Sequence, residues 1–186
     1  MRKSTTESSK IVSNKKLNEL KFNACKILFN CRQTLLARQP FVGTIAMGLN
    51  IKPVRDNRLE TAATDGKNIF FDIDFLSRLN NEERVFIIAH EVWHNVLCHF
   101  LRTENRDREI FNIATDIEVN EILIAEGFSV PKNACLAKTF GFTPGLSAEE
   151  YYNLLIKKNS KNNQPNNNAN DSGSSNDSSS GSDSTN

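Results

Sequence analysis

Residues 85–94 constrain the fold more than any other segment, because an apolar run leads there directly into two histidines and a glutamate. The run reads Val-Phe-Ile-Ile-Ala and is followed by His90, Glu91 and His94. A helix that is apolar on all sides is buried inside a protein. Polar groups on a buried helix need partners, since burying them unpaired is costly. The fold must therefore bring partners for these three side chains to this helix.

The spacing of the two histidines predicts a metal site. On a helix, His90 and His94 lie one turn apart on the same face, so both imidazoles can reach one tetrahedral Zn²⁺ ion. Glu91 stands beside the first histidine, in position to take a proton from a zinc-activated water. We therefore predict Zn²⁺ as the cofactor, His90 and His94 as metal ligands, and Glu91 as the catalytic general base. The alternative is that two of the three histidines match the pattern by chance, which would leave their buried polar groups without partners.

A third ligand is expected from a second long helix, predicted over residues 107–126. Asn112, Asp116 and Asn120 form a polar row at four-residue steps there, beside an apolar row. A carboxylate bordering the apolar face can complete a two-histidine, one-acid zinc site. Asp116 is the best candidate, and the alternative is that it is a surface residue. Glu118 is predicted to point roughly the opposite way.

His99 is predicted to support the site or to pack near it rather than to bind the metal. It follows His94 by five residues and, on a continuous helix over residues 81–101, lies on the far side from His90. Metzincins have a third histidine six residues after the second, where this chain has Phe100. The sequence is therefore not that of a metzincin.

The remaining pattern predicts an α+β fold. We expect an amphipathic helix over residues 15–38, a strand over residues 41–49, and a hairpin around Asp65-Gly66. A third helix starts at Ser147, so a small antiparallel sheet would pack against the histidine helix and the ligand-bearing helix. The expected regions are a disordered N-terminus (1–14), one folded domain with the predicted metal site (15–158), and a disordered Asn/Ser/Asp-rich tail (159–186).

Composition narrows the function further. The net charge is +1, and no basic stripe with interleaved aromatics indicates nucleic-acid binding. No segment has the apolar length of a secretory signal or of a membrane span. The four cysteines lack Cys-x-x-Cys spacing and are expected to be reduced core residues. These features predict a cytoplasmic protein that binds neither nucleic acid nor membrane.

With these residues identified, the chain resembles the bacterial and phage "putative metallopeptidase domain" family, found at the N-terminus of VWA-like proteins. Four stretches carry the resemblance: residues 61–66, residues 89–94 with His99, residues 112–116 with Asn120, and residues 145–152. The resemblance implies a zincin-like fold and supports Asp116 as the third ligand. A wider similarity to gluzincins places Asn120 where those enzymes have an acid that orients a histidine.

The chain departs from the family in two places. Cys98 stands where the family often has a small residue before the later histidine. Family members also commonly continue into a VWA-like domain, whereas this sequence runs into a polar tail. The resemblance therefore implies a VWA-like or MoxR-type ATPase partner as an expectation.

These features together predict a zinc metallopeptidase that acts on a protein or peptide substrate. The substrate backbone is expected to pair with residues 67–72 as the edge strand of the sheet. The alternative is a zinc-stabilised protein-interaction module that cleaves nothing.

Overall fold

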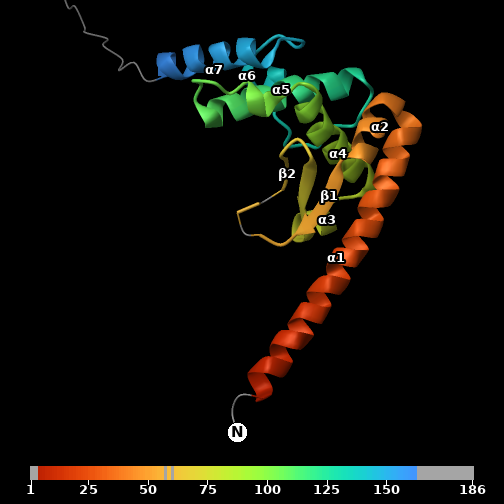
Figure 1. Ribbon diagram of the computed structural model, residues 1–186. Coiled ribbons are helices and arrows are strands. Elements are labelled where there is room, and N and C mark those ends of the chain that lie inside the picture. Colours follow the sequence, from red (N-terminus) through yellow and green to blue (C-terminus); the bar gives the residue numbers. More distant parts are fainter. Residues whose placement is uncertain (1–3, 57, 60, 163–186) are drawn as a thin grey trace, which may run out of the picture.

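The computed structural model describes residues 4–56, 58–59 and 61–162. These residues form seven α-helices, a short 3₁₀-helix and three β-strands (Figure 1), so the predicted α+β class is confirmed. In chain order the elements are α1 (Ser4–Arg38), α2 (Pro40–Gly48), β1 (Asn50–Val54), β2 (Ala62–Thr64), β3 (Asn68–Asp72), α3 (Ile73–Arg78), α4 (Asn81–Val96), η1 (His99–Leu101), α5 (Arg108–Ala125), α6 (Ala137–Phe140) and α7 (Ala148–Asn162).

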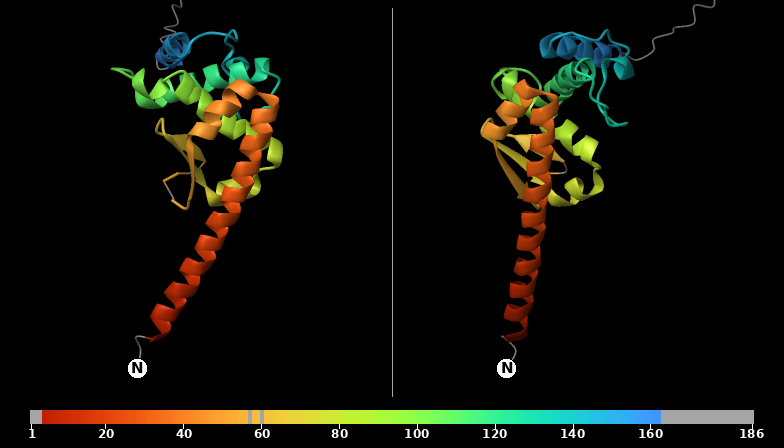
Figure 2. Two further views of the ribbon diagram at one scale, coloured as in Figure 1. Left: turned by 45° about the vertical axis from the view of Figure 1, so that its right-hand side comes forward. Right: turned by 90° about the vertical axis from the view of Figure 1, so that its right-hand side faces the viewer.

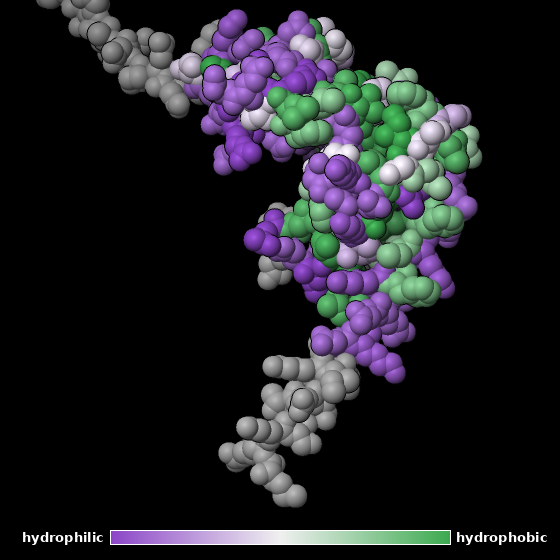
Figure 3. Space-filling model, viewed as in Figure 1, coloured by the Kyte–Doolittle hydropathy of each residue, from purple (hydrophilic) through white to green (hydrophobic). Residues whose placement is uncertain are grey.

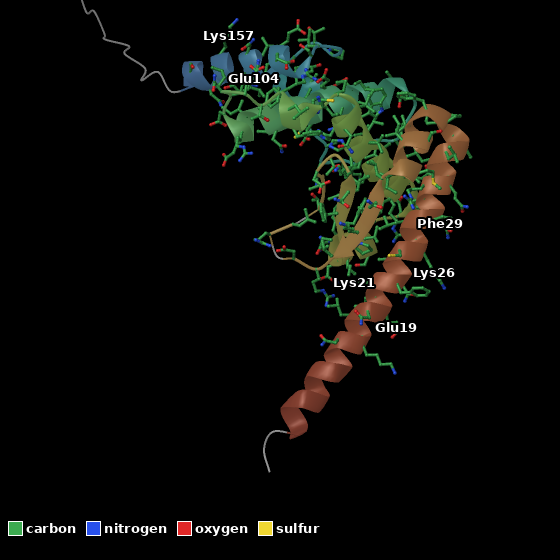
Figure 4. The ribbon with its side chains drawn as sticks, in the orientation of Figure 1. Glu19, Lys21, Lys26, Phe29, Glu104 and Lys157 are labelled. Carbon is green, nitrogen blue, oxygen red and sulfur yellow. The ribbon has the colours of Figure 1, made fainter. Side chains whose placement is uncertain are left out.

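Helix α1 is longer than the predicted helix. It is helical from Ser4 onward, where the sequence indicated a disordered lead-in to residue 14, and residues 1–3 lie outside the described part. Its first turns project beyond the body of the molecule in every view (Figures 1 and 2). Farther along, Lys26 and Phe29 are exposed on the side of the helix that faces away from the sheet (Figure 4).

The predicted strand over residues 41–49 is wrong, because this segment forms α2. Pro40 stands in the first turn, a position that suits its fixed φ. Gly43 lies against α1 so closely that an added Cβ would stand 2.2 Å from Cα of Leu36. Gly43 therefore allows α1 and α2 to approach each other closely. Arg32 of α1 donates to the carbonyl oxygens of Ala46 and Leu49, which holds the end of α2 in place.

The sheet is mixed, which corrects the predicted purely antiparallel arrangement. The strand order is β1-β3-β2, with β1 parallel and β2 antiparallel to β3. The predicted hairpin is confirmed, since Asp65 N–H donates to Asn68 O and Gly66 has φ +90° in the turn. The central strand is β3, so the expected edge strand at residues 67–72 is also wrong. Among the described residues, β1 and β2 form the two edges of the sheet.

Two apolar clusters flank the helix pair α4 and α5. The larger one joins α1, α2, the sheet, α3 and α4, with Ile69, Phe71 and Ile88 fully buried. The smaller one lies between α5 and α7, around Ile117 and Tyr151. Helices α5 and α7 run side by side at the end of the molecule opposite the start of α1 (Figure 2). The face on which α4 meets α5 thus lies between the two clusters.

The ends of the chain and the cysteines bear on the remaining expectations. Helix α7 extends to Asn162, and residues 163–186, which hold most of the predicted tail, lie outside the described part.

All four cysteines are unpaired, as predicted, but only Cys31 is fully buried. None of the helices in the described ranges combines the length and the apolar character needed to span a bilayer.

The contact at Gly43 gives a stability prediction. Replacing Gly43 with alanine forces a methyl group into the backbone of α1, so the free energy of unfolding should fall by about 1–3 kcal/mol. Gly48→Ala is the matched control, because nothing lies within 4 Å of an added Cβ there. Urea denaturation measures both, and equal stabilities of the two variants would contradict the close packing of α1 and α2.

Candidate metal centre

Three electron-pair donors from α4 and α5 meet at one point. Nε2 of His90 lies 2.9 Å from Nε2 of His94, and Oδ1 of Asp116 lies 3.4 and 3.2 Å from these two nitrogens. Tetrahedral zinc with ligands at about 2.0–2.1 Å places its ligand atoms roughly 3.3 Å apart. The three predicted ligands are therefore brought together at a spacing that fits such an ion.

Asn120 determines which nitrogen of His90 faces the cluster. Its Oδ1 lies 3.0 Å from Nδ1 of His90, while its Nδ2 donates to the carbonyl oxygen of Cys135. The bond to Cys135 fixes the orientation of the amide, so Oδ1 accepts a proton from Nδ1. The lone pair of a neutral His90 is then left on Nε2, where a metal would bind. This is the orienting role that the resemblance to gluzincins implied for Asn120.

The electrostatics of the cluster favour a cation at its centre. Burial alone would raise the pKa of Asp116, but hydrogen bonding to His90 and His94 holds it well below its usual range. Burial lowers the pKa of His94. Burial opposes a charge on His90 as well, yet the carboxylates of Asp116 and Glu91 leave its pKa raised. The carboxylate of Asp116 thus favours a positive charge at this site, where the two imidazoles are largely shielded from water.

Glu91 is buried beside these donors, on the same helix. It is 7% exposed, and burial raises its pKa to about 7, with His90 opposing this rise and Asp116 adding to it. A carboxyl group with a pKa near neutrality can both accept and return a proton at physiological pH. The structure therefore places an acid–base group next to the candidate metal ligands.

The predicted continuous helix over residues 81–101 is wrong in a way that changes the site. The capping box of Asn80 and Glu83 starts α4 as predicted, but the helix ends at Val96. Cys98 follows in the left-handed region, with φ 53°, and η1 begins at His99. The break turns His99 back under the helix end, so its Nδ1 lies 2.9 Å from Nδ1 of His94. The left-handed backbone also explains why a small residue suits position 98.

Glu118 points away from Asp116, as predicted: its Oε2 accepts from the backbone N–H of Ala148 in α7, whereas Asp116 faces the histidines of α4. Its side chain is only 13% exposed, and its Oε2 also lies 3.0 Å from Nε2 of His99. His99 packs against His94, as expected, and is not among the three converging donors. The supporting carboxylate was missed because a helical wheel places Glu118 away from Asp116. No local sequence pattern indicates that η1 folds back to contact Glu118.

The metal centre opens into a cleft of about 790 Å³ between β2, α4 and α5. Figure 3 shows this side of the molecule hollowed between the β2–β3 hairpin and the layer of α5 and α7. The aromatic side chains that line the cleft are Phe75, Phe86, Phe100 and Phe111. The cleft is therefore an open, partly apolar groove with the candidate metal centre in its wall.

Strand β2 forms one rim of the cleft. Thr61 and Asp65 share backbone hydrogen bonds with β3, so by alternation the backbone groups of Ala62 and Thr64 face away from the sheet. The hydroxyl of Thr64 accepts a hydrogen bond from Nδ2 of Asn95, at 2.9 Å. Asn95 adjoins His94, so this bond ties the rim strand to the metal-binding helix.

Comparison with known proteins agrees with this site. Residues 27–186 match the profile of the family described as "putative metallopeptidase domain", and the chain belongs to that family. No curated protein and no solved structure matches the chain. Membership indicates a metal-dependent hydrolase, and the histidine–histidine–aspartate cluster is a group that can hold the metal.

The left-handed backbone at Cys98 gives a second stability prediction. Cys98→Gly should raise the free energy of unfolding by about 0.5–1 kcal/mol, because glycine adopts φ 53° without strain. Cys25, also an exposed free cysteine, lies inside α1, so Cys25→Gly should lower stability by about 0.5–1 kcal/mol. Chemical denaturation checks the pair. A loss of stability in both variants would argue against a strained position 98.

Asp116 gives a prediction on metal affinity. Asp116→Asn removes the only charged donor of the three, so the Kd for zinc should rise by more than the roughly 10–100-fold that loss of an outer hydrogen-bonding partner costs. Competition with a chromophoric chelator measures the Kd, and elemental analysis gives the stoichiometry. Asp74→Asn, an exposed aspartate paired with Arg55, is the control. An unchanged Kd in Asp116→Asn would remove this residue from the ligands.

Proposed function

We propose that the protein is a zinc metallopeptidase with His90, His94 and Asp116 as metal ligands and Glu91 as general base. One observation carries the proposal: three candidate ligand atoms converge beside a buried carboxyl group, in the wall of an open cleft. A site built only for stability needs neither the buried carboxyl nor the cleft, since structural zinc sites are closed by four protein ligands.

The donor set suits zinc, and three ligands leave a coordination position for substrate or water. When bound, zinc supplies Lewis acidity, which polarises the scissile carbonyl group and makes water easier to deprotonate. The carboxylate of Glu91 takes the proton from the attacking water and returns it to the leaving amine. Burial keeps this carboxyl out of bulk solvent, so the proton passes between the reacting groups.

Strand β2 would align the substrate. The backbone groups of Ala62 and Thr64 face outward along the rim of the cleft, and an extended peptide can pair with them as an added strand. Such pairing recognises the backbone of the substrate and not particular side chains. It therefore suits a protein or peptide substrate. The bond between Thr64 and Asn95 holds this strand at a set distance from the metal ligands. This arrangement supports a zincin-like reading of the fold.

The rival function is an interaction module that uses zinc for stability alone, and Glu91 distinguishes the two. Glu91→Gln keeps the size and burial of the side chain but cannot accept the proton, so hydrolysis of a peptide library should fall by about 10²–10⁴-fold. The variant should still bind zinc, because Glu91 is not one of the three donors. The assay compares wild type and variant after zinc loading, with a chelator-treated sample as the blank.

Two results would count against the peptidase. Cleavage that persists at the wild-type rate in zinc-loaded Glu91→Gln would remove Glu91 as the base. Zinc-loaded wild-type protein that cleaves no member of a broad peptide library would favour the interaction module.

A further inference from the structure

We propose that Glu118 and His99 are positioning residues that set the tautomer of His94 through a relay of two hydrogen bonds. The relay would leave the lone pair of His94 on Nε2, directed at the metal. This inference rests on the metal-binding part of the proposed function and not on peptide hydrolysis. It assigns a purpose to a buried histidine and a buried carboxylate that the reaction itself does not use.

The relay is continuous from α5 to α4. Oε2 of Glu118 lies 3.0 Å from Nε2 of His99, and Nδ1 of His99 lies 2.9 Å from Nδ1 of His94. His99 is 5% exposed, so water does not readily replace either partner. Both distances are those of ordinary hydrogen bonds.

The position of each proton follows from what each group can offer. A carboxylate only accepts, so the proton at the first contact is on Nε2 of His99. A neutral His99 then has only a lone pair on Nδ1, and Nδ1 of His94 must donate to it. The remaining lone pair of His94 lies on Nε2, which faces His90 and Asp116. The opposite arrangement would put a proton on Nε2 of His94, where it would block the metal.

Glu118 is itself held in place by groups from two other elements. The backbone N–H of Ala148, at the start of α7, donates to the same Oε2 at 3.1 Å. The guanidinium of Arg102 lies 3.8 Å away and is anchored by Glu149 of α7. A carboxylate held by a backbone donor and a nearby cation keeps its orientation, which suits the end of a relay.

The two histidine ligands are thus oriented by different means. His90 donates to the neutral amide of Asn120, whereas His94 donates to an imidazole that is backed by a carboxylate. Partners of this kind fix the ring and increase the basicity of the ligating nitrogen. Loss of the relay should therefore weaken metal binding without removing a ligand.

Nuclear magnetic resonance tests the proton positions directly. The chain has three histidines, and all three lie at the site, so long-range ¹H–¹⁵N spectra of the zinc-loaded full chain contain three rings to assign. We expect His90 and His94 to carry their proton on Nδ1 and His99 to carry its proton on Nε2. A proton on Nδ1 of His99, alone or together with Nε2, would overturn the relay.

Measurements of metal affinity test the consequence of the relay. Glu118→Met, which removes the acceptor, and His99→Phe should each raise the Kd for zinc by about 10–100-fold in a chelator competition. Glu121→Met is the matched control: Glu121 is also on α5 and also accepts a hydrogen bond from a backbone N–H, that of Ala137. It contacts no histidine, so its Kd should stay at the wild-type value. Thermal melting of the metal-free variants reports any loss of folding separately.

The outcomes separate this inference from the peptidase proposal. An unchanged Kd in a folded Glu118→Met or His99→Phe, or an equal rise in Glu121→Met, would overturn the relay alone. Zinc-loaded protein with the expected tautomers but no hydrolysis would support the relay and contradict the peptidase. Wild-type protein that binds no zinc would overturn both.

Discussion

The structure depends on the meeting of two helices whose contact face carries buried polar groups. Helix α4 brings two imidazole nitrogens to this face, and α5 brings a carboxylate oxygen, all within 4.8 Å of one another. Apolar packing on both sides of the helix pair keeps these groups close, although burying them is costly. A bound cation would offset this cost, so folding and metal binding would favour the same arrangement.

Much of this centre could be predicted because its signals are local. The spacing of His90 and His94 and the capping box at Asn80 each depend on residues within a few positions of one another. Asp116 followed from helical periodicity on α5. The hairpin at Asp65-Gly66 followed from turn chemistry. Patterns of this kind determine where a helix or turn starts and which face it buries, whatever lies around it.

The errors arose where distant segments decide the outcome. The apolar run that forms α2 has the composition of a strand, and its close contact with α1 at Gly43 cannot be read from the local pattern. The parallel pairing of β1 with β3 depends on the path of the intervening chain. At the end of α4, Cys98 adopts a backbone conformation that cysteine rarely takes, so the sequence indicated no break. The contact of Glu118 with His99 was then missed, since His99 reaches Glu118 only through that break.

One polar contact fixes the distance between strand β2 and the candidate metal ligands. Thr64 contacts both its own hairpin and Asn95 of α4, so this edge of the sheet is tied to the helix that carries His90 and His94. A single polar contact of this kind limits sliding of the hairpin along the helix. Edge strands otherwise have few constraints on their position, because only one side is paired.

The carboxylate of Glu118 has a second partner, and that has a thermodynamic consequence. The same Oε2 that faces His99 also accepts the first backbone N–H of α7. If Glu118 positions His94 as proposed, docking of α7 and affinity for the metal are linked, and linkage is reciprocal. The free energy that a docked α7 adds to metal binding equals the free energy that a bound metal adds to the docking of α7. Helix α7 would then be expected to exchange its amide hydrogens more slowly in the loaded protein than in the metal-free one.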